Sequence, residues 1–319
     1  MQTQWILSVA LIVAALSMGS SVCSAQTFLY DRQTSVVGAA KILATHIANK
    51  NESLIELARQ NSLGYNEIML ANPDLDPFVP GEGAEIRLPI AWVLPDVPQE
   101  GMVINLSEMR LYFFHSSKQG NASKVSTFPI GIGDEGLDTP VGTFKIIERI
   151  ANPAWHPPKS IREERPELPA VVPPGPDNPL GTHALRLSLR SYLIHGTNRP
   201  YAIGRRATHG CIRVYPEEIP TLYELVPVGA KVSIVKQPVK VGVRNKRVFV
   251  EIHEDPDVKI SSYFEETISL LKKMGLMKNI STKKLYQAVR QKDGIPADIS
   301  LDEKEGPTPP VVAPEFWTL

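Results

Sequence analysis

A series of short apolar runs, broken by glycine and proline, constrains the fold more than any other feature of the chain. Residues 102–114 (MVINLSEMRLYFF) hold two such runs around Ser107 and Glu108, a pattern that predicts a β-hairpin. Repeated short strands with glycine turns predict a mainly β domain. The other strand-like runs are TFPIGIG at 127–133, GTFKII at 142–147 and LRLSLRSYLIH at 185–195.

Prolines are concentrated in one segment of this region. Nine of the thirty residues from 152 to 181 are proline. Because proline lacks a backbone N–H and fixes φ, we expect neither a helix nor an internal strand there. The prediction is a stiff surface loop, and loops of this length are often functional; an uninvolved insertion is the alternative.

The composition is that of a globular protein. The chain has 319 residues, of which 43% are apolar and 21% are charged, enough for two or three domains. Lys+Arg and Asp+Glu number 34 each. This balance creates no overall field that would recruit nucleic acid or an anionic membrane, so we expect neither as a partner.

The N-terminus has the pattern of a signal peptide. Residues 1–25 contain no charged side chain, and residues 5–18 (WILSVALIVAALSM) form an apolar run of suitable length. Small residues follow, so we predict cleavage after Ala25 and export to a periplasm. The alternatives are a lipid anchor on Cys23, which the preceding Val22 disfavours, and a retained membrane anchor, which needs ~20 apolar residues.

Cysteine usage follows from this prediction. The chain has two cysteines, Cys23 and Cys211, and removal of the signal peptide leaves Cys211 alone. A single thiol in an oxidising compartment is buried and inert, paired with another chain, or reactive for a purpose.

Residues 38–90 carry the pattern of two short helices between two strands. The helix-start sequence NES at 51–53 precedes an apolar stripe at 54–58, and a second helix is predicted over 65–70. Strands are expected near 35–43 and at 84–88.

This region resembles a LysM module, a small α/β (βααβ) fold that binds N-acetylglucosamine-containing glycans such as peptidoglycan. The resemblance is most specific at 71–89 (ANPDLDPFVPGEGAEIRLP). A small helical adaptor without a ligand is the alternative. Residues 89–98 are then expected to form a proline-spaced link to the β domain.

The stretch YLIHGTNRPYAIGRRATHGCIRV at 192–214 places the remaining thiol near two histidines. Thiolate is the nucleophilic form of cysteine, and with a free pKa of about 8.5 a reactive Cys211 needs a base or a positive potential beside it. Histidine titrates near neutral pH and suits that role. Both His209, two residues away, and His195, at the end of another predicted strand, are candidates.

Gly210 directly precedes Cys211. A residue without Cβ lets the backbone turn sharply and aim successive N–H groups at one point. Such amides would stabilise the oxyanion of a tetrahedral intermediate. The sequence therefore predicts acyl transfer through a thioester.

Two other uses of the thiol are disfavoured. A zinc site of His195, His209 and Cys211 would lack a fourth ligand and any CxxC or HExxH spacing, so we expect no metal and no cofactor. An inert buried cysteine does not suit the charged neighbours, which are Arg205, Arg206, His209 and Arg213.

HGT at 195–197 and THGCIRV at 208–214 resemble the active-site signature of the L,D-transpeptidase (YkuD-domain) family of peptidoglycan enzymes. The resemblance spans residues 100–237 and implies a β-sandwich-like catalytic domain. Together with the LysM-like module and a C-terminal extension, it is similar to secreted periplasmic members that anchor an outer-membrane lipoprotein to the wall or cross-link stem peptides. Supporting motifs are PIGIG at 129–133, TPVGTFKI at 139–146, NPAWHPP at 152–158 and NPLGTHALRL at 178–187.

The resemblance implies residue roles. Cys211 would attack the carbonyl of the L-centre of meso-diaminopimelate in a tetrapeptide stem and expel D-alanine. His195 would be the general acid and base, oriented by the Gly196 carbonyl, and the amides of His209, Gly210 and Cys211 would line the oxyanion hole. His209 then acts through its backbone rather than as the base.

Three further residues receive roles with alternatives. Arg213 would grip a substrate carboxylate, or else form a structural ion pair. The 152–181 loop would be a lid with Trp155 as an aromatic wall, or Trp155 would pin the loop to the sheet. Thr208 stands where serine is more usual in the family and keeps the hydroxyl.

Three functions stay open at this level. They are the transpeptidase, an L,D-carboxypeptidase that releases the same thioester to water, and a non-catalytic wall-binding protein. The chain does not reveal whether the acceptor is a second stem, a lipoprotein lysine or a free D-amino acid. A papain-like peptidase is disfavoured because its cysteine precedes its histidine in the chain.

The C-terminal part is less informative. We predict a small α-rich appendage over 238–305, with a strand at 248–252 and helices at 263–277 and 282–291. The proline-rich tail from 306 to 319 is expected to be disordered.

Overall fold

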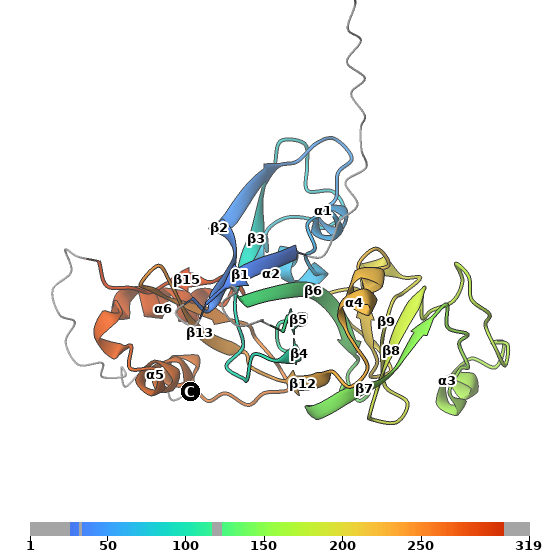
Figure 1. The fold of residues 1–319 in the computed structure, drawn as a ribbon. Helices are drawn as coiled ribbons and strands as arrows, with labels where there is room; N and C mark the ends of the chain where they lie inside the picture. Colours follow the sequence, from blue (N-terminus) through green and yellow to red (C-terminus); the bar gives the residue numbers. More distant parts are fainter. Residues whose placement is uncertain (1–25, 32–33, 117–122, 303–319) are drawn as a thin grey trace, which may run out of the picture.

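The computed structural model describes residues 26–31, 34–116 and 123–302 (Figure 1). The predicted signal peptide at 1–25 and the predicted tail at 306–319 lie outside this part of the chain. Within it, no helix is long and apolar enough to cross a membrane.

Two β-sheets form the central domain and share two long strands, β6 (Ser123–Gly133) and β7 (Gly142–Ala151). One sheet has the order β1-β6-β5-β4-β12-β7, and the other has the order β6-β11-β9-β8-β7. The mainly β domain is thus confirmed. The remaining strands are β1 (Gln26–Tyr30), β4 (Gly101–Asn105), β5 (Arg110–Phe114), β8 (His183–Leu187), β9 (Leu193–His195), β10 (Arg206–Thr208), β11 (Ile212–Val214) and β12 (Lys231–Val235).

Aliphatic side chains from both sheets pack into one core, which is completed by α4 (Ile219–Leu225). Each fully buried side chain of this kind contributes about 1.5–3 kcal/mol of transfer free energy. Alternation along β4 and β5 sends the other side chains to the opposite face of the first sheet, where they meet the N-terminal module. Those residues are Val103, Tyr112 and Phe114.

The N-terminal module has the predicted βααβ order. Strands β2 (Val36–Ile47) and β3 (Glu85–Val93) pair antiparallel around α1 (Leu54–Gln60) and α2 (Tyr65–Ala71). Ser53 begins α1 as its N-cap, and its side chain accepts a hydrogen bond from Glu56 N at 3.2 Å. The identity of the module as LysM stays a prediction.

The predicted link at 89–98 is wrong for its first five residues, because β3 continues through Pro89 to Val93. Pro89 lies opposite Leu43, beside an irregularity in the register of β2. A two-stranded sheet has a free edge on each strand, where the missing N–H of proline removes no ladder hydrogen bond.

The module packs directly onto the first sheet rather than hanging from a linker (Figure 1). Glu67 of α2 forms a buried ion pair with Arg110 of β5 at 2.7 Å and accepts a hydrogen bond from Trp92 Nε1 at 2.7 Å. The Arg110 guanidinium also lies 3.9 Å from the centre of the Trp92 ring. These contacts make the module part of one packed body.

The appendage combines a three-stranded sheet with two helices. The predicted strand is confirmed as β14 and the second predicted helix as α6, whereas α5 ends four residues early, close to Gly275, whose φ is +71°. The sequence prediction missed the first and third strands of the sheet. The elements are β13 (Val239–Arg244), β14 (Arg247–Ile252), β15 (Ala297–Asp298), α5 (Tyr263–Lys273), the 3₁₀ turn η2 (Met277–Asn279) and α6 (Thr282–Gln291).

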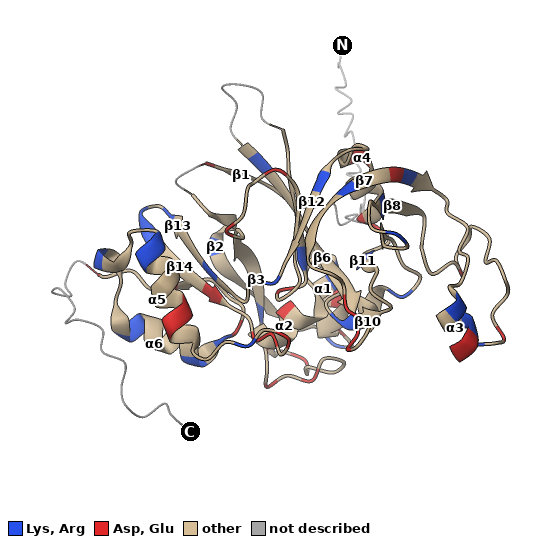
Figure 2. Cartoon of the chain, turned by 90° about the horizontal axis from the view of Figure 1, so that it is seen from below, with Lys and Arg blue, Asp and Glu red and all other residues tan. Residues whose placement is uncertain are grey.

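The 152–181 loop contains a short helix that the proline content led us to exclude. Helix α3 (Lys159–Glu164) occupies a proline-free segment that follows Pro158 at its N-cap. Proline is tolerated at a helix start, which explains the error. Figure 2 shows α3 at the periphery of the molecule, with both acidic and basic residues along it.

Candidate active site

Along the strands of the second sheet, successive side chains alternate between the core and the outer face. In the parallel pair β9 and β11, Ile194 lies beside Ile212, and His195 lies beside Arg213. Both isoleucines are buried in the core. Because successive side chains of a strand point to opposite faces, His195 and Arg213 share the other face.

Cys211 lies in the turn between β10 and β11, directly before Ile212. Its thiol is half-buried and donates a hydrogen bond to Ser191 O at 3.7 Å, just before β9. Cys211 directly precedes β11 and is two residues from Arg213, and residues two apart along an extended chain face the same side. The register of β9 and β11 therefore favours one sheet face for Cys211, His195 and Arg213.

Hydrogen bonds hold residues 208–211, which we call the catalytic turn because this segment carries the candidate nucleophile. Thr208 Oγ1 donates to Cys211 O at 2.6 Å and accepts from Gly210 N at 3.1 Å. Thr139 Oγ1 donates to Gly210 O at 2.9 Å and accepts from Gly133 N at 3.0 Å. The Gly210 N–H thus already has a partner, and an oxyanion must share it with Thr208.

Only glycine fits at position 210. Its φ is +95°, and a Cβ there would lie 2.8 Å from Tyr192 Cε1 and 3.2 Å from Asp138 O. Both the backbone conformation and the space exclude a larger residue. The turn next to Cys211 is therefore rigid by construction.

His195 is buried, with 4% of its surface exposed, and its Nδ1 lies 2.6 Å from Gly196 O. Burial, together with the charge of Arg213, lowers the pKa of His195 to about 4, against a raising effect of the Gly196 carbonyl. If Nδ1 carries the proton for that carbonyl, Nε2 has a free lone pair. This arrangement suits a base.

Burial raises the pKa of Cys211, while the Leu193 hydrogen bond and Arg213 lower it. The net shift is upward. At neutral pH the site therefore rests as a thiol and a neutral imidazole.

The His209 side chain turns away from the thiol toward the loop. It is exposed, and its Nε2 lies 3.3 Å from Glu164 Oε2 at the end of α3. This contact joins the 152–181 loop to the catalytic turn. The His209 ring therefore has a carboxylate of the loop as its hydrogen-bond partner.

Arg213 donates through Nη1 to Ala207 O at 3.0 Å, and its buried Nε has no partner. Burial and the nearby charge of Arg199 lower the pKa of Arg213. No ion pair among the described residues includes Arg213, which argues against the structural ion pair. Trp155 is half-buried and pairs with Val172 inside the loop.

Sequence patterns missed several residues that support the turn. Thr139 stands in the quoted TPVGTFKI motif, but nothing local tells that its hydroxyl reaches Gly210, 71 residues on. Arg199, which lowers the pKa of Arg213, likewise lies between the two motifs and carries no signal of its own. Such roles depend on which loops meet.

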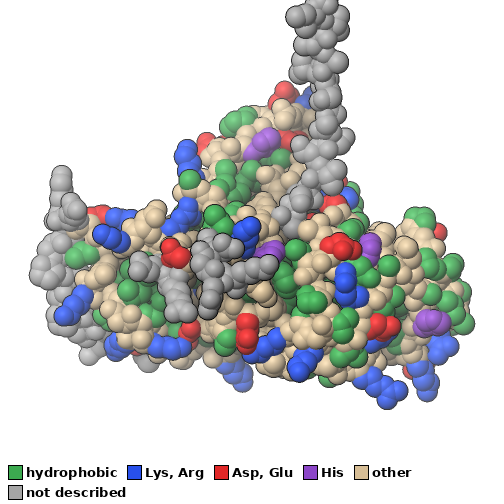
Figure 3. Space-filling model, in the orientation of Figure 1, with side chains coloured by type: hydrophobic (Ala, Val, Ile, Leu, Met, Phe, Trp, Pro, Cys, Tyr) green, Lys and Arg blue, Asp and Glu red, His purple; other side chains and the backbone are tan. Residues whose placement is uncertain are grey.

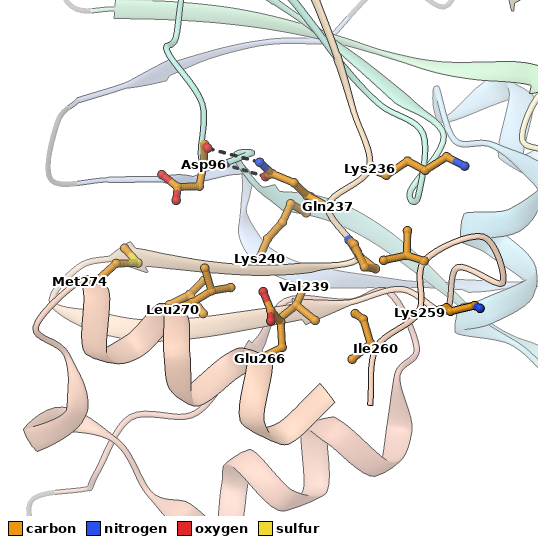
Figure 4. A pocket seen from close by; sticks show the side chains of 13 residues that line it. Asp96, Lys236, Gln237, Val239, Lys240, Lys259, Ile260, Glu266, Leu270 and Met274 are labelled. Carbon is orange, nitrogen blue, oxygen red and sulfur yellow. Dashed lines mark hydrogen bonds between the residues drawn. The ribbon is translucent and has the colours of Figure 1, made fainter. Parts of the chain in front are cut away.

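Two cavities of the described chain lie away from the Cys211 thiol. One of about 430 Å³ is at the base of the 152–181 loop, lined among others by Asn178, Thr197 and Asn198. The other, of about 300 Å³, lies between α5 and β13 and has Lys236, Leu270 and Met274 on its walls (Figure 4). Cys211 lines neither.

Acidic and basic side chains are interspersed over the face shown in Figure 3. A group of potential metal ligands in the described chain, Glu108, Glu251 and His253, is remote from Cys211 in the sequence. Both of its carboxylates pair with Lys240 Nζ, at 2.6 and 2.7 Å. The ammonium supplies the positive charge there.

The fold and the site define a two-sheet β protein that carries a cysteine and a histidine on one outer face. A family model described as the L,D-transpeptidase catalytic domain (YkuD) matches residues 99–234. "Probable L,D-transpeptidase YcfS" of Escherichia coli (strain K12) is 41% identical over 67% of this chain and 68% of its own. "Probable L,D-transpeptidase YbiS" of the same strain is 35% identical over 83% and 89%. The chain therefore belongs to the L,D-transpeptidase family.

A solved structure is also similar. The catalytic domain of the Enterococcus faecium L,D-transpeptidase aligns over 44% of this chain and 99% of that chain, at 17% identity. Its TM-score of 0.33 is too low to establish a common fold by itself.

Proposed function

We propose that this family member is a peptidoglycan L,D-transpeptidase with Cys211 as its nucleophile. The observation that carries the proposal is the half-buried thiol, held in a hydrogen-bonded turn on the same sheet face as His195. Sγ attacks the carbonyl of the L-centre of meso-diaminopimelate in a tetrapeptide stem. A thioester forms, and the bond to the terminal D-alanine breaks.

His195 moves the protons. Nε2 takes the thiol proton as Sγ attacks and gives it to the leaving amine of D-alanine. An acceptor amine then attacks the thioester carbonyl and passes its proton through His195 to the departing sulfur. The 2.6 Å contact from Nδ1 to Gly196 O supports this orientation of the ring.

Backbone amides of His209, Gly210 and Cys211 are the proposed oxyanion donors. One such donor contributes about 2.7–4 kcal/mol of transition-state stabilisation in known cases. Thr208 fixes the turn that presents them. Its hydroxyl performs the task of the serine more usual in the family.

Arg213 is the proposed grip for a substrate carboxylate. A planar guanidinium binds carboxylates in a bidentate manner, and the buried Nε of Arg213 is unpaired. The 152–181 loop is proposed as a lid over the donor groove, with Trp155 as a wall. Its contact with the catalytic turn through Glu164 and His209 supports this placement.

The remaining proposals concern location and partners. The N-terminal module, if LysM, would bind glycan strands, and export by the N-terminal segment would place the enzyme in the periplasm with its substrate. The acceptor is an amine of a second stem or of a lipoprotein lysine. No metal or cofactor enters this chemistry.

The deciding experiment is incubation of the mature protein with a disaccharide-tetrapeptide, followed by mass spectrometry. A cross-linked dimer with loss of D-alanine supports transpeptidation, whereas a trimmed tripeptide alone assigns a carboxypeptidase. Cys211→Ala is the control and should give neither product. Either product from that variant would remove Cys211 from the mechanism.

A further inference from the structure

Arg206 joins three segments of the chain. It lies on β10, two residues before Thr208. Its Nη1 donates to Asp257 Oδ2 at 2.5 Å, and its Nη2 donates to Asp138 Oδ1 at 3.0 Å. Asp257 belongs to the appendage, between β14 and α5, and Asp138 belongs to the loop between β6 and β7.

The Asp138 loop forms a wall of the catalytic turn. Asp134 N donates to Thr208 O at 2.9 Å, and Thr139 Oγ1 donates to Gly210 O at 2.9 Å. The carbonyl oxygen of Asp138 faces the space beside Gly210. A displacement of this loop would therefore move the peptide groups next to Cys211.

The Asp257 end of the bridge is anchored. Its carboxylate also accepts a hydrogen bond from Lys236 Nζ at 2.9 Å, and its N–H donates to Asp255 Oδ1 at 3.0 Å. Asp255 in turn accepts from the buried Ser107 hydroxyl at 2.6 Å, in the β4–β5 turn of the first sheet. Asp257 and Asp255 thus tie the appendage to the catalytic domain at three residues, Arg206, Lys236 and Ser107.

We propose that Asp257 is a positioning residue, through which the appendage holds Arg206, the Asp138 loop and hence the catalytic turn in the reactive geometry. The inference rests on the proposed function. It gives the appendage a part in turnover in addition to its part in folding. Small displacements of a reacting group cost large factors in rate, so loss of this bridge should lower kcat rather than substrate affinity.

The test compares variants of two aspartates, Asp257 and Asp302, each of which pairs with two basic side chains. Asp257→Asn weakens the bridge to the catalytic domain, while Asp302→Asn weakens pairs with Arg247 and Lys284 that stay inside the appendage. We expect kcat of D257N for the tetrapeptide donor to fall roughly tenfold with KM within about twofold. D302N should keep the wild-type kcat, although the Tm of both variants falls.

Arg206→Lys is a second variant, because lysine keeps the charge but cannot span both carboxylates, and it should repeat the loss in kcat. Wild-type kcat in a folded D257N or R206K overturns the inference. If the wild-type protein makes no product, the proposed function has failed instead. The family resemblance predicts that a carbapenem acylates the nucleophilic cysteine. The rate of that acylation needs no stem peptide and also compares the variants.

Discussion

Burial sets the resting protonation of the two residues at the centre of the site. It lowers the pKa of His195 and raises the pKa of Cys211. The pair is therefore a neutral imidazole and a thiol near neutral pH, and not an imidazolium with a thiolate. In the proposed mechanism the thiol proton therefore leaves as the new bond forms, with His195 as the base of the first step.

We expect acylation of Cys211 by a carbapenem to persist down to about pH 5 and to decline only near the His195 pKa of about 4. The base form of the imidazole survives until the pH reaches that value. Rates of adduct formation, followed by mass spectrometry across this range, measure it. An acid limb near the ordinary histidine pKa of about 6.5 contradicts the burial argument.

Arg213→Gln tests whether the Arg213 charge helps to lower the pKa of His195. The Arg213 charge lowers the pKa of His195, so its removal should raise that pKa and move the acid limb to higher pH. The pKa of Cys211 should rise as well, because the same charge lowers it. An unchanged acid limb would mean that Arg213 does not act on His195.

Gly210→Ala should lower the acylation rate at least roughly tenfold and destabilise the fold by about 1–3 kcal/mol. The new Cβ would press on Tyr192 and on the Asp138 carbonyl. Gly229→Ala is the matched control, with a φ of +88° and open space around it. It should lose stability in urea unfolding but keep the wild-type acylation rate.

At the scale of elements, α3 connects the proline-rich loop to the catalytic turn by one exposed contact, Glu164 to His209. Exposed pairs are worth about 0–1 kcal/mol, so this contact holds the loop only weakly to the turn. A proposed lid needs this property. The rest of the loop base is tied more firmly, since buried Asn178 bonds to the carbonyls of Pro153, Val172 and Pro173.

Glu164→Gln should raise KM for the tetrapeptide donor by less than about fivefold and leave kcat near the wild-type value. The reason is that the variant weakens loop closure without touching Cys211 or His195. Glu163→Gln, which weakens only the Lys159 pair on the same helix, is the control. An equal effect of both variants would exclude the specific contact.

At the scale of the whole molecule, one buried ammonium joins three parts of the chain. Lys240 of β13 lies 2.6 Å from Glu108 and 2.7 Å from Glu251, and it donates to Val93 O at 2.7 Å. Burial raises the pKa of Glu108. Burial alone would also raise the pKa of Glu251, but Lys240 and His253 lower it.

Lys240→Met should lower the free energy of unfolding by about 3–5 kcal/mol, because it leaves two buried carboxylates without their cation. Urea unfolding measures the loss. Lys292→Met, which removes an exposed pair with Glu254, should change stability by less than about 1 kcal/mol. Similar losses in the two variants would show that the buried junction is not a structural centre.

Much of the architecture could be predicted from local sequence patterns. Strand alternation, turn glycines and helix starts depend on residues a few positions apart, so the hairpin at 102–114, the βααβ order and α6 could all be predicted. The catalytic motifs at 195–197 and 208–214 are also contiguous, which made them visible. The same local rules failed at 89–93 and at α3, where proline sits at positions that tolerate it.

The sequence by itself determined most of the strand pattern and singled out Cys211 with two candidate histidines, and the family resemblance then favoured His195. Only the tertiary structure decided that His209 turns to Glu164, that Arg206 bridges Asp138 and Asp257, and that the N-terminal module shares a core with the first sheet. These contacts join residues far apart in the chain. Their strength depends on burial and on the surfaces that meet, neither of which a local pattern encodes.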